Sequence, residues 1–546
     1  MKSRISVSDN RSLSPRSFRP ANEWIAALQE GGPSLSNLLR QTYGHDASLI
    51  EERRKAILRL SKLAAKTLGP NRPFVICRSP GRVNLMGRHV DHRGGYANVM
   101  AIDKETLIAA APRADDKVNL VNADNAAFPR RDFTITEPLG SNLEDNWVDF
   151  VDSPGVTRTL QSAPGDWSHY ARAALLRLQH EQHDQHLHGM DCVVLGNVPM
   201  GAGLSSSSAL LVAFAQAAVA LNGLKIEVSD FVDLCGEAEW FVGSRGGSMD
   251  HAAITTSKAG YITRMGFFPF RVDGAVQLPD GTDVVVVDSG EKAVKSAGAP
   301  ARDVFNQRVA TYELAERLLR QTWRPAANAE HLRDLIPHRL GVSPSALYHA
   351  IASLPNRPSR RRLRELLSSQ DTIELDRLFS THANRGDYDL RGVVLYGLGE
   401  CSRSERFSGL LEKGDIAAVG RYMRVSHNGD RQWTHSPDGN QKRFTVRTDT
   451  ASLNRLALAE TDLIHVPGRY GCSTQAIDRI VDRASRAEGV IGAQITGAGL
   501  GGCAVVMVKS EFRDGLLNML EREAGDGHTF ISRPVAGAGL LSLQGN

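Results

Sequence analysis

The sequence predicts an α+β fold in two halves that join near residue 260. β-Branched and apolar residues cluster at 73–112 and again at 259–290, a pattern that is typical of strands. Within 190–223 an apolar strand pattern runs through a Gly/Ser loop into a long helical stretch of Ala, Leu and Val, and the chain from about residue 301 is largely helical. A chain of 546 residues is also too long for one hydrophobic core, so two domains are expected.

The first half begins with a segment, 1–21, that is rich in Ser and Arg and is predicted to be a disordered tail. Helical periodicity starts near Asn22 and continues through 48–69, where a Gly-Pro pair ends the helix. The segment "PFVICRSPGRVNLMG" at 73–87 is predicted to be a strand that enters a turn, and 96–112 is predicted to be β-rich.

After residue 223, predicted helices and strands alternate, and from about residue 301 the predicted elements are mainly helices. They are expected as a helix at 228–243, strands at 259–272 and 282–290, helices with Pro-rich breaks at 324–358, a helix at 474–488 and a strand–loop–helix at 490–520. We therefore expect an N-terminal domain at 22–260 and a C-terminal domain at 261–546.

The composition excludes several classes of protein. Net charge is only +4 over the whole chain, so no nucleic acid or other polyanion is expected as a partner. Six cysteines lie without CxxC spacing and are predicted to be reduced, buried side chains. There is no apolar run of about 18 residues and no signal-peptide pattern, so we expect a cytoplasmic protein without a membrane partner. We expect the protein to be a monomer or a weak homodimer.

Two further tracts resemble functional sites but are expected to be structural. The His-rich tract at 180–189 lacks the HExxH spacing of a metal site and is predicted to be a solvated connection. The Arg-rich tract at 357–366 lacks interleaved aromatic residues and is predicted to be a charged helix face.

The segment "PMGAGLSSSSA" at 199–209 is the first candidate for chemistry. Glycines at 201 and 203 let the backbone approach an anion, and the serines that follow open a helix whose free N–H groups and dipole attract phosphate. A serine hydroxyl there can also ligate Mg²⁺. The loop is not a Walker A motif, because no GK[ST] follows, and a simple Gly/Ser turn that caps a helix is the alternative interpretation.

Three segments together resemble one family. They are "SPGRVNLMGRHVDHRGG" at 79–95, "VPMGAGLSSSSAL" at 198–210 and "ITGAGLGGCAVVMV" at 495–508. In this order they resemble the three signatures of the GHMP kinase superfamily, and specifically of its galactokinase branch. The resemblance extends over about residues 35–545. It implies a two-domain GHMP kinase fold with nucleotide and sugar sites between the domains.

The resemblance also implies an activity and a set of residues. Galactokinases use ATP and Mg²⁺ to phosphorylate the anomeric hydroxyl of a sugar, which gives a sugar 1-phosphate. The matching catalytic residues are Asp250 and Arg82, where the arginine favours the ionised form of the aspartate and stabilises charge on the phosphoryl group. The matching substrate-binding residues are Arg88, His89 and Asp91.

The nucleotide side of the site follows from the second and third signatures. The ATP-binding residues implied are Pro199, Gly201, Ala202, Gly203, Leu204, Ser205, Ser206, Ser207 and Ser208, and the third motif contributes Gly497, Gly499, Gly501 and Gly502. The implied metal ligands are Ser206, with Ser207 as the other candidate serine, and Glu239, although the spacing from Glu239 to Asp250 is one residue shorter than the family pattern.

Arg88 departs from the family, which has a glutamate at this position that accepts a hydrogen bond from the C6 hydroxyl of the sugar. Arginine only donates, so a carboxylate at C6 would suit it better, and we predict a uronic acid such as galacturonate. The "DHRGG" segment also resembles the DHQGG of galacturonate kinases. The alternatives are galactose itself, a pentose that lacks C6, or an Arg88 that turns away to pair with a protein acid. Phe305 is a second departure, because the family has a sugar-contacting tyrosine there.

Two other functions fit the same family less well. A catalytically idle sugar sensor would tend to have a damaged serine loop, whereas "GLSSSSA", Arg82 and Asp250 are all present here. A superfamily kinase for isoprenoid or amino-acid substrates is not expected to have the His89 and Asp91 pair.

Overall fold

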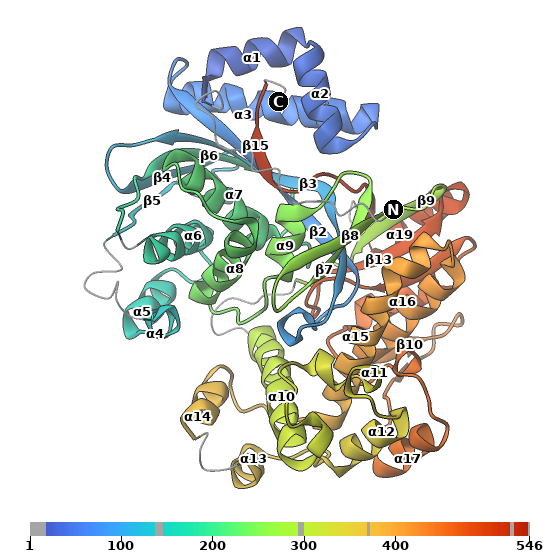
Figure 1. Cartoon of the computed structure of the whole chain (residues 1–546). Coiled ribbons are helices and arrows are strands. Elements are labelled where there is room, and N and C mark those ends of the chain that lie inside the picture. The colour runs from blue at the N-terminus through green and yellow to red at the C-terminus, as the bar shows by residue number, and fades with distance from the viewer. Residues whose placement is uncertain are drawn as a thin grey trace.

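The computed structural model describes residues 18–136, 146–182, 184–292, 300–367, 372–524 and 529–543. Residues 1–17 of the predicted tail lie outside the described residues. The prediction of disorder is wrong for the last residues of the tail, because Arg19–Pro20 (β1) pair with β2 and Ala21 begins the first helix. Mixed helices and sheets are present, as the α+β prediction requires (Figure 1).

A nine-stranded sheet forms the centre of the first half, in the order β1-β2-β3-β6-β4-β5, with β15 paired to β2, β7 to β3 and β8 to β7. All of its pairs are antiparallel except β4 with β6. Its other strands are β2 (Pro73–Met86), β3 (Ala97–Pro112), β4 (Lys117–Asn122), β5 (Arg131–Thr134), β6 (Met190–Gly196), β7 (Tyr261–Gly266), β8 (Arg271–Gln277) and β15 (Gly539–Leu541).

A four-stranded antiparallel sheet belongs to the second half, in the order β12-β13-β9-β14. Its strands are β9 (Thr282–Asp288), β12 (Val490–Ile495), β13 (Cys503–Lys509) and β14 (Thr529–Ser532). The strand–loop–helix predicted at 490–520 therefore contains a second strand, β13, after the loop. A hairpin of β10 (Trp433–His435) and β11 (Gln441–Arg443) lies apart from both sheets.

Helices cover the nine-stranded sheet. One group lies at the top of Figure 1, as α1 (Ala21–Glu30), α2 (Pro33–Tyr43) and α3 (Ala47–Leu68). The second group is α4 (Trp147–Val151), α5 (Pro154–Ser162), α6 (Ser168–Glu181), α7 (Ser206–Leu221), α8 (Val228–Ala238) and α9 (Met249–Thr256). The Ala-rich α7 packs directly on β2 and β3, because its small side chains allow close approach to the sheet.

The second half is largely helical, as predicted. Its helices are α10 (Pro300–Thr322), α11 (Pro337–Leu340), α12 (Pro344–Ser353), α13 (Arg360–Leu366), α14 (Thr372–Ser380), α15 (Leu390–Glu412), α16 (Ile416–Asp430), α17 (Thr450–Leu458), α18 (Gln475–Ala484) and α19 (Arg513–Ala524). Residues 360–366 of the Arg-rich tract form α13, in which Leu363 is buried and Arg361, Arg362 and Arg364 are exposed, as predicted for a charged helix face. Arg360 departs from this prediction, because it is half-buried and donates to the Tyr388 hydroxyl and the carbonyl oxygen of His382.

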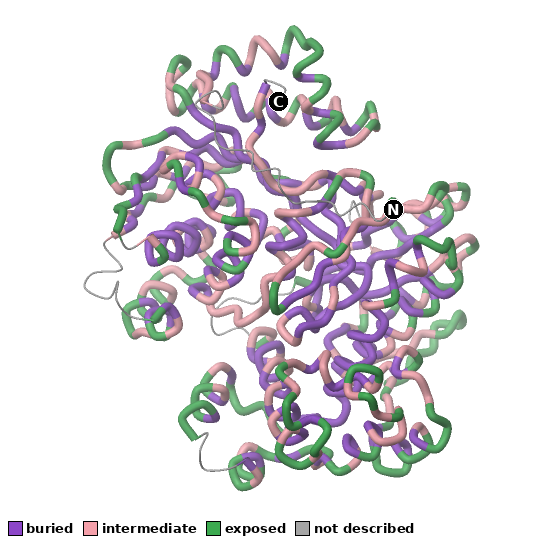
Figure 2. Tube along the Cα trace, viewed as in Figure 1, coloured by how far each residue is buried: buried purple, intermediate pink, exposed green. Residues whose placement is uncertain are grey.

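The two halves share structure across the predicted boundary at residue 260. The strands β7 and β8 follow that boundary but extend the first sheet, and β15 returns to it from the end of the chain. One buried cluster contains side chains of both sheets, and Figure 2 shows the buried segments running through the middle of the molecule. All six cysteines are buried and free of disulfides, as predicted. None of the helices that the structure describes combines the length and apolar character that a membrane crossing requires.

Candidate active site

The Gly/Ser loop connects β6 to α7, as the sequence predicts. Gly201 and Gly203 have φ of 68° and 72°, a left-handed conformation that side chains disfavour. Ser205 stands at the N-cap position, also with positive φ and without a side-chain capping hydrogen bond, and α7 begins at Ser206. The free N–H groups and positive dipole end of a sixteen-residue helix therefore point into this loop.

The third glycine motif packs against this loop from the second half of the chain. A Cβ atom on Gly497 would lie 2.3 Å from the carbonyl oxygen of Gly203, and one on Gly502 would lie 2.8 Å from the backbone of Ala202. These distances are far below a van der Waals contact, so only glycine allows the two loops to meet. Gly499 makes an equally close approach to the carbonyl oxygen of Cys472.

The predicted catalytic pair is brought together at the same loop. Arg82 lies on β2 and Asp250 in the first turn of α9, and the arginine donates from Nε and Nη2 to the two carboxylate oxygens at 2.7 and 2.6 Å. Nη1 of Arg82 donates to the carbonyl oxygen of Gly203 at 2.7 Å, and the Ser205 hydroxyl donates to Asp250. Arg82 is 3% exposed but the side chain of Asp250 is 25% exposed, so a ligand can reach the carboxylate.

Glu239 lies beside the serines at the start of α7, as a metal ligand would require. It follows α8 directly, and its Oε1 accepts a hydrogen bond of 2.7 Å from the Ser208 hydroxyl. This differs from the predicted partner, Ser206, because residues two apart on a helix project to nearly opposite sides. A carboxylate and a hydroxyl are the hard oxygen ligands that Mg²⁺ prefers. The nearby Tyr170 phenol has its pKa raised by burial and by the charge of Glu239.

Asp91 and His89 lie in the first signature segment, 79–95, which we call the sugar motif, and both are buried. Oδ2 of Asp91 accepts a hydrogen bond from the backbone N–H of Met249, the residue before Asp250, at 3.3 Å. Burial acts to raise the pKa of Asp91, but the hydrogen bond and charge of His92 lower it. Burial and the charge of Arg88 lower the pKa of His89 well below its ordinary value, which favours a neutral imidazole.

Aromatic residues that sequence reasoning did not select surround His89. Its ring stacks on that of Tyr470 at a centroid distance of 4.2 Å, and the ring of Tyr396 lies 6.0 Å away. Phe305 lies 6.5 Å from His89, so the residue at the family's tyrosine position does face the sugar motif.

Arg88 adopts the alternative in which it pairs with a protein acid. Its Nη2 donates to Oδ2 of Asp430 at 2.8 Å and to the Ser426 hydroxyl at 3.1 Å, and the arginine side chain is 1% exposed. The backbone N–H of Arg88 donates to Glu400, on α15. Sequence reasoning missed Asp430, Ser426 and Glu400, because they lie on helices hundreds of residues away and belong to none of the three motifs.

His89, Asp430 and Cys472 also form the one group in the described part of the chain whose geometry could hold a metal ion, with ligand atoms within 4.8 Å of one another. Arg88 places a positive charge directly on Asp430, which disfavours a divalent cation there. We therefore interpret this group as part of the hydrogen-bonded support of the sugar motif.

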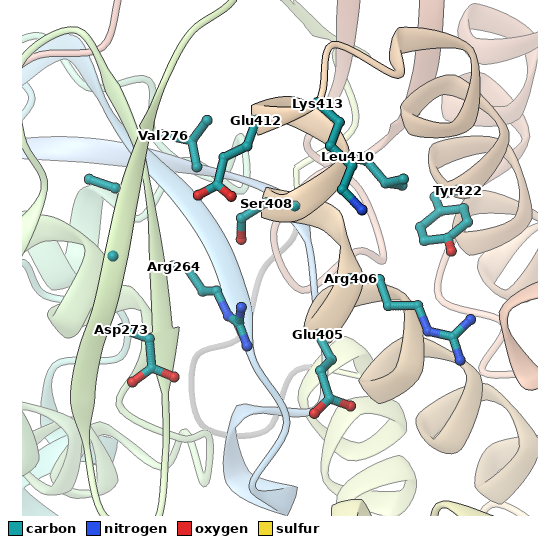
Figure 3. Close-up of a pocket in the computed structure, with 13 residues that line it drawn as sticks. Arg264, Asp273, Val276, Glu405, Arg406, Ser408, Leu410, Glu412, Lys413 and Tyr422 are labelled. Carbon is teal, nitrogen blue, oxygen red and sulfur yellow. The ribbon is translucent and has the colours of Figure 1, made fainter. Parts of the chain in front are cut away.

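A separate cavity of about 380 Å³ lies between β8 and the helices α15 and α16 (Figure 3). None of the predicted site residues lines it. Several of the charged side chains in its wall already pair with residues of the protein, since Arg406 contacts Asp462, Glu405 contacts Arg339, and Asp273 contacts Arg271. We assign this cavity no part in catalysis.

Known proteins match this chain along most of its length. Residues 169–258 match the GHMP kinases N terminal domain, residues 442–525 match the GHMP kinases C terminal family, and residues 65–112 match the galactokinase galactose-binding signature. A galactokinase from Roseiflexus sp. (strain RS-1) is 30% identical over 438 residues, which cover 80% of this chain and 84% of that protein.

The fold also has a counterpart among solved structures. The crystal structure of Lactococcus lactis galactokinase complexed with galactose aligns with a TM-score of 0.60 at 20% identity, and the alignment covers 88% of this chain and 98% of that chain. The region 65–112 contains the first signature segment with Arg82, the region 169–258 contains the Gly/Ser loop and Asp250, and the region 442–525 contains the third glycine motif. The chain therefore belongs to the galactokinase family of the GHMP kinases.

Proposed function

We propose that this protein transfers the γ-phosphoryl group of ATP to the anomeric (C1) hydroxyl of a galactose-like sugar. The observation that carries the proposal is the contact of Arg82 and Asp250 with the phosphate loop, through Gly203 and Ser205. A carboxylate fixed beside a phosphate-binding loop is the arrangement that phosphoryl transfer to a hydroxyl needs. The match to a galactose-binding signature and the relationship to galactokinases support a sugar as the acceptor.

In the proposed step Asp250 acts as the general base. Its carboxylate takes the proton of the C1 hydroxyl, the sugar oxygen forms a bond to the γ-phosphorus, and the bond from that phosphorus to the bridging oxygen breaks, so ADP leaves. Arg82 donates to both carboxylate oxygens of Asp250, which fixes the orientation of the carboxylate. The arginine also adds positive charge beside the loop in which the phosphates would lie.

The nucleotide phosphates would lie at the N-terminus of α7, over Gly201 and Gly203. Ser208 and Glu239 would hold Mg²⁺, because they bring a hydroxyl and a carboxylate oxygen together at this helix end. Bound there, the ion would neutralise charge on the transferred phosphoryl group. For the sugar we propose hydrogen bonds from the ring hydroxyls to Asp91 and His89, since each buried hydroxyl needs a partner.

A panel of sugars tests this function. The purified protein is incubated with ATP, Mg²⁺ and galactose, galacturonate, arabinose, glucose or mevalonate, and release of ADP is followed. Nuclear magnetic resonance of the product then locates the phosphate on C1 or elsewhere. ADP release with a galactose-like sugar and phosphate on C1 would support the proposal. Sugar binding without ADP release, or turnover of mevalonate alone, would overturn it. Galacturonate, predicted from Arg88, is compared directly with galactose in this panel.

A further inference from the structure

Arg88 is held by a helix of the other half of the protein. Both of its side-chain partners, Asp430 and Ser426, lie on α16, and all three side chains are buried. Asp430 is fully buried and also accepts hydrogen bonds from the Tyr396 hydroxyl at 3.2 Å and the backbone N–H of Cys472 at 3.4 Å. Its position is therefore fixed from three directions, and Arg88 is fixed with it.

The contacts of Arg88 leave no pair of adjacent N–H donors, or fork, that could bind a carboxylate. A guanidinium binds a carboxylate side by side through Nε with Nη2 or through Nη1 with Nη2, so each fork needs Nη2. Both hydrogens of Nη2 are already donated, one to Asp430 and one to Ser426. Among the residues that the structure describes, Nε and Nη1 of Arg88 are buried and have no partner. Such single donors suit one neutral oxygen, such as that of a hydroxyl.

The charges around Arg88 are balanced by the protein itself. Asp430 compensates Arg88, and Glu400 pairs with Arg403 at 3.0 Å while its other oxygen accepts a hydrogen bond from the Ser426 hydroxyl. These four charged side chains are all within 1% of complete burial. Within this cluster of four side chains no positive charge is left uncompensated, so a sugar carboxylate placed against Arg88 would bring an additional negative charge, which is costly in a buried environment.

We infer that Asp430 is a positioning residue that determines sugar specificity. Asp430 neutralises the charge of Arg88 and occupies the Nη2 group of that arginine. The site therefore takes a sugar with a neutral group at C6 and rejects a uronic acid. The inference rests on the proposed function, since it places the C6 side of the sugar near Arg88, the position at which the resembling family has its C6-contacting glutamate. It selects galactose over galacturonate, in contrast to the preference predicted from Arg88 alone.

The test is the ratio of kcat/KM for galacturonate to that for galactose, measured in the wild type and in Asp430→Asn. The substitution keeps the shape of the side chain and removes its charge, so the positive charge of Arg88 is no longer compensated and can attract a substrate carboxylate. We expect the wild type to prefer galactose and the ratio to rise at least about 30-fold in Asp430→Asn. A merely structural loss would lower both activities and leave the ratio unchanged, and that result would overturn the inference.

Four further variants sharpen the result. Asp430→Glu retains the charge and should keep the wild-type ratio, whereas adding Arg88→Met to Asp430→Asn should abolish the gain. Asp415→Asn, at the other end of α16, is the matched control and should not move the ratio. If Asp430→Asn does not fold, Ser426→Ala frees one hydrogen of Nη2 and should raise the ratio by a smaller factor. An unchanged ratio in a folded Ser426→Ala would then count against the inference.

Binding measurements separate this inference from the proposed function. If the wild type binds galactose but does not phosphorylate any sugar, the proposed function fails, and calorimetric affinities for the two sugars replace kcat/KM in the same comparison. A wild type that prefers galacturonate, in turnover or in affinity, would overturn the role of Asp430 while the proposed kinase activity survives. A wild type that binds neither sugar would overturn both.

Discussion

Replacing Asp250 with Asn tests the proposed base with the smallest change in shape. The carboxylate accepts two hydrogen bonds from Arg82 and one from Ser205, and an amide can accept only at its single oxygen. The new NH₂ group would face a donor of Arg82 or Ser205, so at least one charge-assisted bond is lost. The proton acceptor for the sugar hydroxyl is lost as well. Loss of a placed acid–base group lowers kcat by about 10²–10⁴-fold, which is about 3–5 kcal/mol in the activation barrier.

The same substitution should affect stability less than activity. Arg82 is 3% exposed and would lose its counterion, but the carboxylate that it loses is itself 25% exposed, so solvent can compensate in part. We expect a loss of about 1–3 kcal/mol in the free energy of unfolding.

The assay is ADP release at saturating sugar and ATP, with thermal unfolding and nucleotide affinity measured on the same preparation. Asp514→Asn on the exposed start of α19 is the control and should match the wild type in all three. If Asp250→Asn retained a kcat within a factor of about three of the wild type, Asp250 would not be the base.

Three other changes probe the phosphate loop, the metal ligands and a buried carboxyl. Gly497→Ala should weaken ATP binding by at least about 10-fold, because its Cβ would lie 2.3 Å from a carbonyl oxygen of the facing loop. Gly439→Ala is the control, since Gly439 has a similar positive φ but open surroundings. Equal nucleotide affinity in the two variants would refute the role of the contact. Ser208→Ala should raise the Mg²⁺ concentration for half-maximal rate by about 10-fold, and Ser206→Ala should raise it less. A larger increase in Ser206→Ala than in Ser208→Ala would instead favour Ser206, the ligand predicted from the sequence. Burial raises the pKa of Asp103 from 3.8 to about 6, so its contribution to stability is present below about pH 4 and is lost as the pH rises through 6. Asp103→Asn should therefore gain up to about 2–3 kcal/mol over the wild type between pH 5 and pH 8, and a thermal-unfolding difference that does not change with pH would contradict the raised pKa.

The residues that could be predicted from the sequence are those that lie in local motifs. Arg82, the glycines of both loops and Asp250 are each fixed by a strand, a turn or a helix start that a short segment encodes, and the structure brings them together. Ser208 was harder to select, because four serines in succession carry the same local signal and only the position of Glu239 on another helix distinguishes them. Asp430 gives no local signal at all. Its partner is decided by how α16 packs near β2, which depends on the whole fold.

Arg82, in the proposed catalytic pair, and Arg88, in the proposed sugar site, belong to one short segment but contact different parts of the protein. Arg82 is tied to α9 and the phosphate loop, both from the first half of the chain, whereas Arg88 is tied to α16 and α15 of the second half. A displacement of α16 would therefore shift Arg88 while leaving the contacts of Arg82 with Asp250 in place. Changes at Asp430 should accordingly appear in KM and in the choice of sugar, and changes at Asp250 should appear in kcat. The two arginines lie six positions apart and contact different halves of the protein. If the proposed roles hold, the choice of sugar can therefore change in this fold without any change in the contact of Arg82 with Asp250.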